Sequence, residues 1–425
     1  MINIGHGGKE IVERVLPKNV ALKKLKEVKE AKVKELPVRL QIATEVIDIA
    51  YGFFSPLEGF MTKADVEAVC KNMTLADGKT VWSIPIVFDI SEAELKEKGI
   101  KQFDEVLLTY MGTPLAMFDI TDVFTYDLKE MAMMVYGTTE EKHPGVKRTY
   151  DYEGKFLGGK ITLFNPPKIN EPYKKFWLTP KQMRERFTEK GWEMIVAHQT
   201  RNVPHTGHEW LMKGAWLGAY GSLPVERSLG GCLVNAIIGD KRTGDYIDEA
   251  IILTHDALRT AGYFREDAHL ATISLWDMRY AGPREAVFHA VLRTNLGCTH
   301  HMFGRDHAGV GSYYDPYDAH RIFNKIAEGG IRIKPIFNLD WWYCPVCAEV
   351  TYSGLCAHKG QKQSFSGTLI RSIIQDGVKP PRLIFRPEVF DIIMECAEKY
   401  GSGSPFVTEE YLKKRNPVFT IEPLE

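Results

Sequence analysis

Residues 193–213 read EMIVAHQTRNVPHTGHEWLMK, and this stretch decides the fold. Its apolar run, residues 194–197, is typical of a strand that is buried on both faces of a parallel sheet. From residue 209 to 220 apolar residues recur at helical spacing, which predicts a helix. Residues 198–208 between them are mostly polar and form the predicted turn. The stretch therefore predicts one strand–turn–helix unit of a parallel α/β fold.

A polar turn at the carboxyl end of such a strand is a place where α/β proteins bind ligands. The free N–H groups of the next helix and its dipole favour an anion there. The turn supplies a cation, neutral donors and two imidazoles: Arg201; Gln199, Thr200 and Asn202; His205 and His208. The alternative is a polar loop with helix-capping residues, but so many polar groups in one turn favour an anion site.

The alternation of strands and helices continues to residue 303. We predict strands at 233–238, 270–275 and 300–303, and helices at 179–190, 245–263 and 283–295, the first of them capped by Thr179. A second polar turn follows the last strand and contains Gly304, Arg305, Asp306, His307, Ala308 and Gly309. Both turns face the same crevice of a doubly wound sheet, so we expect them to converge on one phosphate-bearing ligand.

A further turn, residues 238–245, carries Lys241 and Arg242, which either contact an anion or lie in solvent. Residues before 165 differ in pattern. Strand-like runs at 84–90, 105–110, 115–120 and 161–164 predict a mostly antiparallel first domain, a small barrel, with helices at 41–51 and 64–70. The Lys- and Glu-rich segment 22–35 predicts a solvated helix or arm without assigned function.

Consecutive prolines at 166 and 167 mark a domain boundary. We predict three domains, 1–168, 169–337 and 338–425. The third contains Cys344, Cys347, Cys356 and His358 at C-x2-C-x8-C-x-H spacing, which predicts a closed structural zinc site; coincidental reduced surface cysteines are the alternative. Ser366 is a candidate cap for a following helix, and residues 387–400 predict a last amphipathic helix.

The composition is that of a soluble globular protein, with 44% hydrophobic and 26% charged residues. The formal net charge of −1 argues against a nucleic-acid or anionic-membrane binder. No apolar run reaches the ~20 residues of a membrane helix, and residues 1–8 lack the apolar core of a signal peptide. Seven cysteines, three of them clustered, fit a reducing compartment, so we expect a cytoplasmic protein.

Several motifs together resemble the ATP sulfurylase (sulfate adenylyltransferase) family. They are QTRN followed by HTGH at 199–208, GPREA at 282–286, GRDHAG at 304–309, and SGT at 366–368 with Arg371, while SPLEGFM at 55–61 is similar to the N-terminal signature of the family. They occur in the order of the family, between residues 40 and 400. The family often has Pro directly after the Asn, where this chain has Val203. The zinc spacing is similar to a subset of prokaryotic members, and without a G-x-x-x-x-G-K-[ST] loop we expect no fused kinase domain.

The resemblance implies a PUA-like β-barrel domain, a Rossmann-like nucleotidyltransferase domain, a small C-terminal domain with a zinc-binding insertion, and a homodimer or larger homo-oligomer. It implies that ATP and sulfate give adenylyl sulfate (APS) and pyrophosphate, or the reverse. Gln199, Arg201 and the Ala308 N–H would bind sulfate. The catalytic residues would be Thr200, Arg201, Asn202, His205 and His208. The nucleotide would be held by Gln199, Thr200, Arg201, Asn202, His205, His208, Gly304, Arg305, Asp306 and His307.

No Ser/His/Asp or Cys/His nucleophile set is evident, so we expect direct in-line attack of a sulfate oxygen on the α-phosphorus of ATP, with Mg²⁺ on the leaving pyrophosphate. Two alternatives remain. One is another His-x-x-His adenylyltransferase with a different acceptor, and the other is a non-catalytic nucleotide-binding zinc protein. The direction of the reaction is not fixed by the sequence, because one transition state serves both directions.

Overall fold

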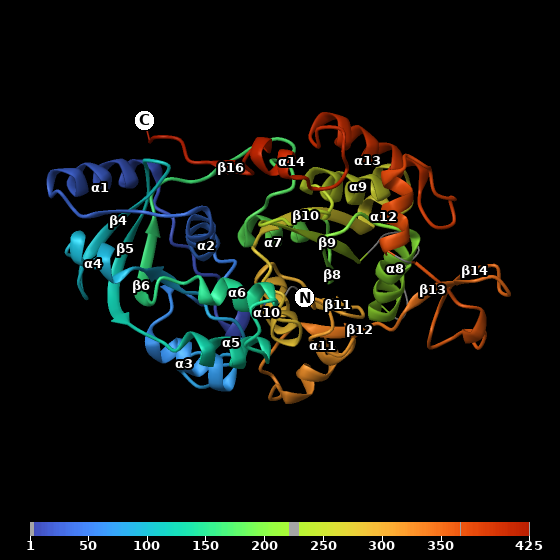
Figure 1. Cartoon of the computed structure of the whole chain (residues 1–425), viewed down its shortest axis with the longest axis horizontal. Coiled ribbons are helices and arrows are strands. Elements are labelled where there is room, and N and C mark those ends of the chain that lie inside the picture. Colours follow the sequence, from blue (N-terminus) through green and yellow to red (C-terminus); the bar gives the residue numbers. More distant parts are fainter. Residues whose placement is uncertain (1–3, 221–228, 366, 425) are drawn as a thin grey trace.

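The computed structural model describes residues 4–220, 229–365 and 367–424. The sheet of the N-terminal part lies to the left in Figure 1, and the parallel sheet of the central part lies to the right. The polar loops that the sequence singles out all belong to the central part.

The N-terminal sheet has the strand order β1-β4-β5-β6-β2, with β3 paired to β6. Only β1 and β4 run parallel; the other pairs are antiparallel. The strands are β1 (Glu35–Pro37), β2 (Gly59–Phe60), β3 (Phe88–Ile90), β4 (Glu105–Tyr110), β5 (Thr113–Phe124) and β6 (Lys155–Leu163). Among the described residues these pairings form a branched path, and the sheet is mostly antiparallel, as the sequence predicted.

Six helices accompany this sheet: α1 (Lys18–Glu30), α2 (Leu40–Ala50), α3 (Lys63–Asn72), α4 (Glu92–Glu97), α5 (Leu128–Tyr136) and α6 (Pro144–Tyr150). The sequence indicated α2 and α3 but missed the short α4, α5 and α6. Helix α1 is not simply solvated, because Leu25 and Val28 pack against Leu107 of β4. Strand β6 starts earlier than predicted, since Gly158 and Gly159 interrupt the alternation that would reveal it.

The central sheet is parallel, with the order β10-β9-β8-β11-β12. Its strands are β8 (Met194–Thr200), β9 (Gly230–Ile238), β10 (His269–Leu275), β11 (His300–Phe303) and β12 (Lys334–Phe337). The chain winds from β8 to β10 on one side and then continues with β11 on the other. The strand order therefore reverses between β8 and β11, where ligands bind in sheets of this kind.

The helices of this part are α7 (Pro180–Glu189), α8 (Thr206–Tyr220), α9 (Asp248–Thr260), α10 (Pro283–Asn295) and α11 (Asp318–Arg321). Helix α10 and strand β11 have the predicted bounds, and Thr179 caps α7 in a capping box with Gln182. Strand β8 continues through Thr200, so three residues of the predicted turn belong to the strand. Helix α9 is shorter than predicted, and β12 was not predicted.

The remaining chain forms β13 (Trp341–Cys344), β14 (Glu349–Tyr352), β15 (Gln363–Ser364), α12 (Gly367–Gln375), α13 (Pro387–Lys399), α14 (Glu409–Lys414) and β16 (Phe419–Thr420). The candidate cap Ser366 lies outside the described residues. Strand β16 pairs with β7 (Lys168–Ile169), so the chain end returns toward the N-terminal part, as Figure 1 shows. The boundaries at residues 168 and 337 stay a prediction.

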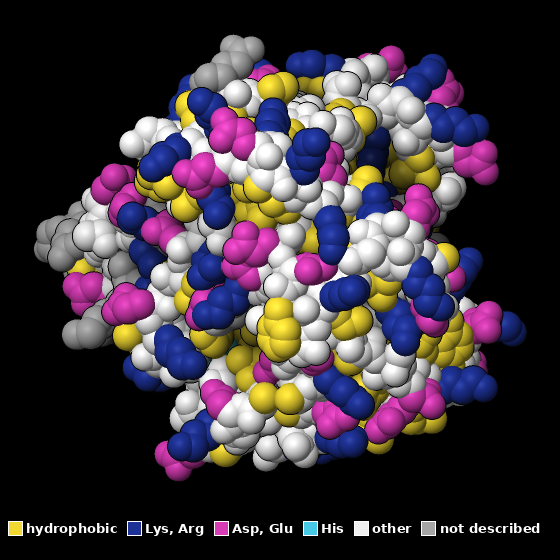
Figure 2. All heavy atoms as spheres, turned by 90° about the vertical axis from the view of Figure 1, so that its left-hand side faces the viewer, with side chains coloured by type: hydrophobic (Ala, Val, Ile, Leu, Met, Phe, Trp, Pro, Cys, Tyr) yellow, Lys and Arg dark blue, Asp and Glu magenta, His cyan; other side chains and the backbone are white. Residues whose placement is uncertain are grey.

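The surface carries charges of both signs. In Figure 2, which faces the N-terminal part, Lys and Arg side chains alternate with Asp and Glu side chains. In the described part of the chain, no helix combines the length and the apolar character needed to cross a membrane.

Candidate functional site

A cleft of about 410 Å³ opens at the carboxyl ends of β8 and β11. It collects nearly all the residues that the sequence singled out: Gln199, Thr200, Arg201, Asn202, His208, Gly304, Arg305, Asp306, His307 and Ala308. The remaining one, His205, lines an adjoining cavity of about 290 Å³ that shares Asn202, His208 and Arg371 with the cleft. The two loops thus meet at one place, as the strand order requires.

Arg201 is fixed at the wall of the cleft. Its Nη1 donates to the Tyr280 hydroxyl, and its Nη2 donates to the Asp240 carbonyl and to Asp245 Oδ2, both at 3.2 Å. Burial works against the charge, but Tyr280 and Asp245 outweigh it and raise the pKa of Arg201 above its ordinary value. Arg201 is therefore a permanent cation with few free rotamers.

Thr200 and Asn202 shape the turn. The Thr200 hydroxyl donates to the Asn202 carbonyl and accepts from the Asn202 N–H, each at 3.1 Å. The Asn202 side-chain oxygen accepts from Arg371 Nη2 at 3.0 Å. These contacts hold the backbone between β8 and α8 in one conformation, and they tie it to α12.

His205 and His208 cap the start of α8 for each other. The His208 N–H donates to His205 Nδ1 at 3.3 Å, and the His205 N–H donates to His208 Nδ1 at 3.4 Å. The rings stack with centroids 3.9 Å apart, and Phe365 stacks on His205. Because both Nδ1 atoms accept, the neutral rings carry their hydrogens on Nε2.

Burial keeps these imidazoles neutral. It lowers the pKa of His208 to about 4 and that of His205 well below its ordinary value, with His208 adding to the effect at His205. Each ring therefore offers a neutral Nε2–H donor and not a charge.

The second loop exposes backbone donors. Asp306 and Ala308 adopt left-handed conformations, with φ of 54° and 57°. The Ala308 carbonyl accepts from the Gly282 N–H at 3.0 Å, while the Ala308 N–H has no partner among residues 4–220, 229–365 and 367–424. The His307 ring contacts His289 at 3.0 Å, and burial followed by Arg293 lowers the pKa of His307 to about 3. The loop thus presents the Ala308 N–H and the Arg305 side chain to the cleft.

The sequence reasoning missed three residues that line the cleft, His198, Asp245 and Tyr280. Arg242, which it gave as a possible anion contact, and Arg371, which it gave as part of a motif, line the cleft as well. Arg242, Asp245 and Tyr280 follow β9 and β10, so the rule that ligands gather at carboxyl ends of strands was a usable signal. The structure corrects both readings that the sequence left open for Lys241. It is buried and forms an ion pair with Asp248 at 2.7 Å, so it neither contacts an anion in the cleft nor lies in solvent.

Cys344, Cys347, Cys356 and His358 form a compact cluster, with ligand atoms within 4.8 Å of one another. The His358 Nδ1 atom lies 3.3–3.7 Å from the three sulfurs, and Cys347 Sγ lies 3.9 Å from Cys356 Sγ. Tetrahedral zinc would require about 3.6 Å for sulfur–nitrogen and about 3.8 Å for sulfur–sulfur pairs. The N–H groups of Cys347 and His358 also donate to sulfurs. The residues therefore fit zinc.

This cluster sits on the three-stranded sheet β13–β15, beside α8 at the right of Figure 1. Trp341 of β13 stacks on Trp210 of α8, with ring centroids 6.2 Å apart. Gly214 of the same helix provides the space for the Trp341 indole, which a methyl group at that position would overlap. The sheet that carries the Cys/His cluster thus packs against α8, which directly follows His205 and contains His208 in its first turn.

Comparison with known proteins gives one consistent family. The model of the ATP-sulfurylase family matches residues 174–396, and that of the PUA-like domain matches residues 3–166. A sulfate adenylyltransferase of Archaeoglobus fulgidus is 40% identical over 98% of this chain and 96% of its own length. One of Pyrococcus abyssi is 39% identical over 92% of this chain and 98% of its own length. A solved structure described as the hexameric APS kinase of Thiobacillus denitrificans has the same fold, with a TM-score of 0.69, 19% identity, and coverage of 93% of this chain and 68% of that one.

Proposed function

The chain belongs to the ATP-sulfurylase family, and we propose that it is a sulfate adenylyltransferase, which joins sulfate to the α-phosphate of ATP and releases pyrophosphate, or runs the reverse reaction. The observation that carries this proposal is the cleft at the β8–β11 reversal with its adjoining cavity, where Arg201, two neutral imidazoles and the unpaired Ala308 N–H converge.

The proposed division of labour follows the chemistry of each group. Gln199, Arg201 and the Ala308 N–H bind sulfate, a dianion that needs donors and no general base. His205 and His208 donate from Nε2 to the phosphates, at the positive end of α8. The loop from Gly304 to His307 holds the nucleotide.

Catalysis then consists of positioning and electrostatic stabilisation. A sulfate oxygen attacks the α-phosphorus, the bond to the β-phosphate bridging oxygen breaks, and its electron pair leaves on pyrophosphate. Arg201, held by Tyr280 and Asp245, faces the negative charge that gathers in this transition state without having to reorganise. Magnesium bound to ATP would add positive charge on the leaving pyrophosphate; we assign it no protein ligand.

The metal cluster, in this proposal, binds structural zinc, and the protein forms a homodimer or larger homo-oligomer. Metal analysis and light scattering on the purified protein test these two points.

The central experiment is exchange of labelled pyrophosphate into ATP, run with magnesium and with or without sulfate. We expect exchange only with sulfate. If ATP binds but sulfate promotes no exchange, the acceptor is a different one and the alternative adenylyltransferase applies. If no anion supports exchange, the non-catalytic nucleotide-binding protein applies.

Two substitutions at His208 test its proposed role. His208→Asn keeps an acceptor near the Nδ1 position, and with it the contact to His205, but removes the Nε2 donor; His208→Gln keeps a donor near Nε2. We expect His208→Asn to lower the exchange rate roughly a hundredfold, as loss of one such donor does, and His208→Gln to lower it less. His300→Asn is the control, because His300 lies on β11 outside the cleft. Equal rates for His208→Asn and His300→Asn would exclude the role.

A further inference from the structure

A second cleft, of about 490 Å³, lies between the N-terminal and central parts of the chain. It is formed by the start of α2, by α6, by the loops after β9 and β10, and by Arg415 behind α14. None of the residues assigned above to sulfate or nucleotide lines it. Its volume is sufficient for a small phosphorylated ligand.

The lining is rich in cations. Arg39, Lys147, Arg148, Arg242 and Arg415 line the cleft, against Asp151, Asp240 and Asp277. Three of the five arginines and lysines are already paired within the protein: Arg39 with Asp89, Arg148 with Asp277, and Arg415 with Asp248. In the described part of the chain, Lys147 and the Arg242 guanidinium form no ion pair. Two cations are therefore free to turn toward an anionic ligand, although Asp151 and Asp240 of the lining form no ion pair among the described residues either.

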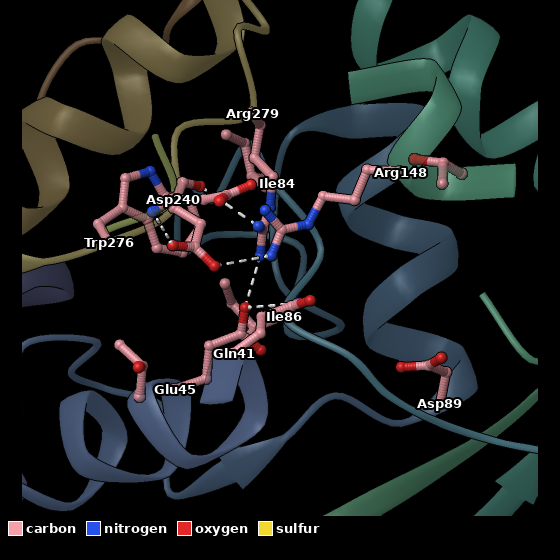
Figure 3. Close-up of polar contacts among 12 residues, drawn as sticks. Gln41, Glu45, Ile84, Ile86, Asp89, Arg148, Asp240, Trp276 and Arg279 are labelled. Atoms are coloured by element: carbon pink, nitrogen blue, oxygen red, sulfur yellow. Dashed lines mark hydrogen bonds and ion pairs between the residues drawn. The ribbon is translucent and has the colours of Figure 1, made fainter. Parts of the chain in front are cut away.

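Helix α2 adds main-chain donors. It begins at Leu40 without a side-chain cap, and Leu40 and Gln41 of its first turn line the cleft. Figure 3 shows Arg148 reaching from α6 toward Asp240, with Gln41 and Glu45 of α2 on the facing side. Glu45 forms a buried ion pair with Arg279, and neither side chain lines the cleft. An uncapped helix start facing unpaired cations suits a phosphate group.

The two clefts share a wall. Arg242, Met278 and Tyr280 line both, and the Arg242 guanidinium lies 4.3 Å from the centre of the Tyr280 ring. The hydroxyl of the same tyrosine accepts from Arg201. An anion that draws Arg242 away from this ring would therefore change the surroundings of Arg201.

We propose that this second cleft is a separate anion-binding site, which takes a small phosphate-bearing molecule, and that its occupancy alters ligand affinity in the first cleft through Arg242 and Tyr280. The binding itself is independent of the reaction; the coupling to substrate affinity rests on the proposed function.

The test is equilibrium binding of labelled pyrophosphate to the full-length protein in magnesium-free buffer, compared with AMP and with inorganic sulfate. We expect two pyrophosphate sites per chain, of which ATP displaces one. Lys147→Glu should weaken the site that ATP does not displace roughly tenfold or more, because it exchanges an attracting charge for a repelling one. Lys129→Glu, an exposed residue of α5 outside the cleft, is the matched control.

Three outcomes decide the proposal. Two pyrophosphate sites in the wild type support the proposal, provided that the site from which ATP does not displace pyrophosphate is weakened by Lys147→Glu and not by Lys129→Glu. If AMP also displaces pyrophosphate from that site, its natural ligand is a nucleotide and not free pyrophosphate. A single site fully displaced by ATP, or equal binding by the two variants, overturns it. If AMP competes at the second cleft as well, the coupling is tested by the KM for ATP at rising AMP, which should shift less in Lys147→Glu than in Lys129→Glu. Because binding needs no turnover, absence of sulfate-dependent exchange would count against the proposed function alone.

Discussion

Gly214→Ala tests whether α8 is stabilised by its contact with Trp341 of β13, in the sheet that carries the Cys/His cluster, independently of the helix propensity of α8 itself. A Cβ atom at residue 214 would lie 3.0 Å from Trp341 Cη2 and closer still to Cζ2. Ordinary carbon–carbon contacts are about 3.5–4.0 Å, so the indole would have to retreat by roughly 1 Å. Such overpacking costs about 1–3 kcal/mol. The gain in helix propensity from Gly to Ala offsets about 1 kcal/mol of this.

Gly218→Ala is the matched control. Gly218 lies one turn further along α8, and a Cβ atom there would meet nothing within 4 Å. Gly218→Ala gains the same helix propensity without the clash, so the free energies of unfolding of the two variants should differ by the overpacking cost alone. At about 2–4 °C per kcal/mol, the melting temperature of Gly214→Ala should lie about 2–12 °C below that of Gly218→Ala.

Thermal melting of the two zinc-loaded proteins measures this difference, and the KM for ATP measures its effect on the cleft. Displacement of Trp341 should move the start of α8, so we expect a higher KM for Gly214→Ala. Equal melting temperatures and equal KM values would show that packing of Trp341 against α8 affects neither stability nor ATP binding, and the reasoning would be refuted.

Three further predictions concern charge and metal. Lys241→Met should lower the free energy of unfolding by about 3–5 kcal/mol, because it leaves the Asp248 carboxylate buried with only Arg415 at 3.9 Å. In thermal melts, the double variant with Asp248→Leu should recover most of this loss. Weakened ATP binding at unchanged stability would contradict the structural role of Lys241. The unliganded protein should lose stability as the pH falls from about 6.5 toward about 4, because the unfolded chain takes up a proton that His208, with its folded-state pKa of about 4, does not; a melting temperature constant over this range would contradict the buried neutral imidazole. Removal of metal by a chelator should release one zinc per chain and lower the melting temperature, and Cys347→Ser should behave like the metal-free protein whereas Cys396→Ser, outside the cluster, should retain the metal.

The sequence predicted the central sheet well because both of its signals are local. Apolar runs followed by polar turns identify buried strands, and Gly282 with Pro283 marks the start of α10. The sequence did not predict strand β12, because this strand has only four residues, one of them Pro335, and its partner β11 lies more than thirty positions earlier in the chain. Its pairing is set by tertiary contacts that no local pattern reports.

The candidate cleft was predicted in outline for the same reason. Residues 199–208 and 304–309 each carry an obvious polar turn, and the topology of a parallel sheet brings such turns together. Lys241 shows the limit of this reasoning. A lysine in a polar loop after a strand has the same local sequence whether its partner is a ligand or a buried carboxylate, and only the position of Asp248 in the first turn of α9 decides between them.

The arrangement of charge in the cleft suits an enzyme whose reaction runs in both directions. Arg201 is held in place by Tyr280 and Asp245, and Arg242, Arg305 and Arg371 also line the cleft, whereas His205 and His208 offer hydrogen bonds without charge. Cations attract the phosphates of ATP and of pyrophosphate alike, and such uniform binding does not accelerate the chemical step. Neutral donors fixed by mutual capping strengthen most where negative charge increases, on the leaving phosphate in the transition state. The reciprocal Nδ1 contacts of the two histidines cap the helix and determine that each Nε2 atom carries the hydrogen, and we propose that this second effect serves the reaction.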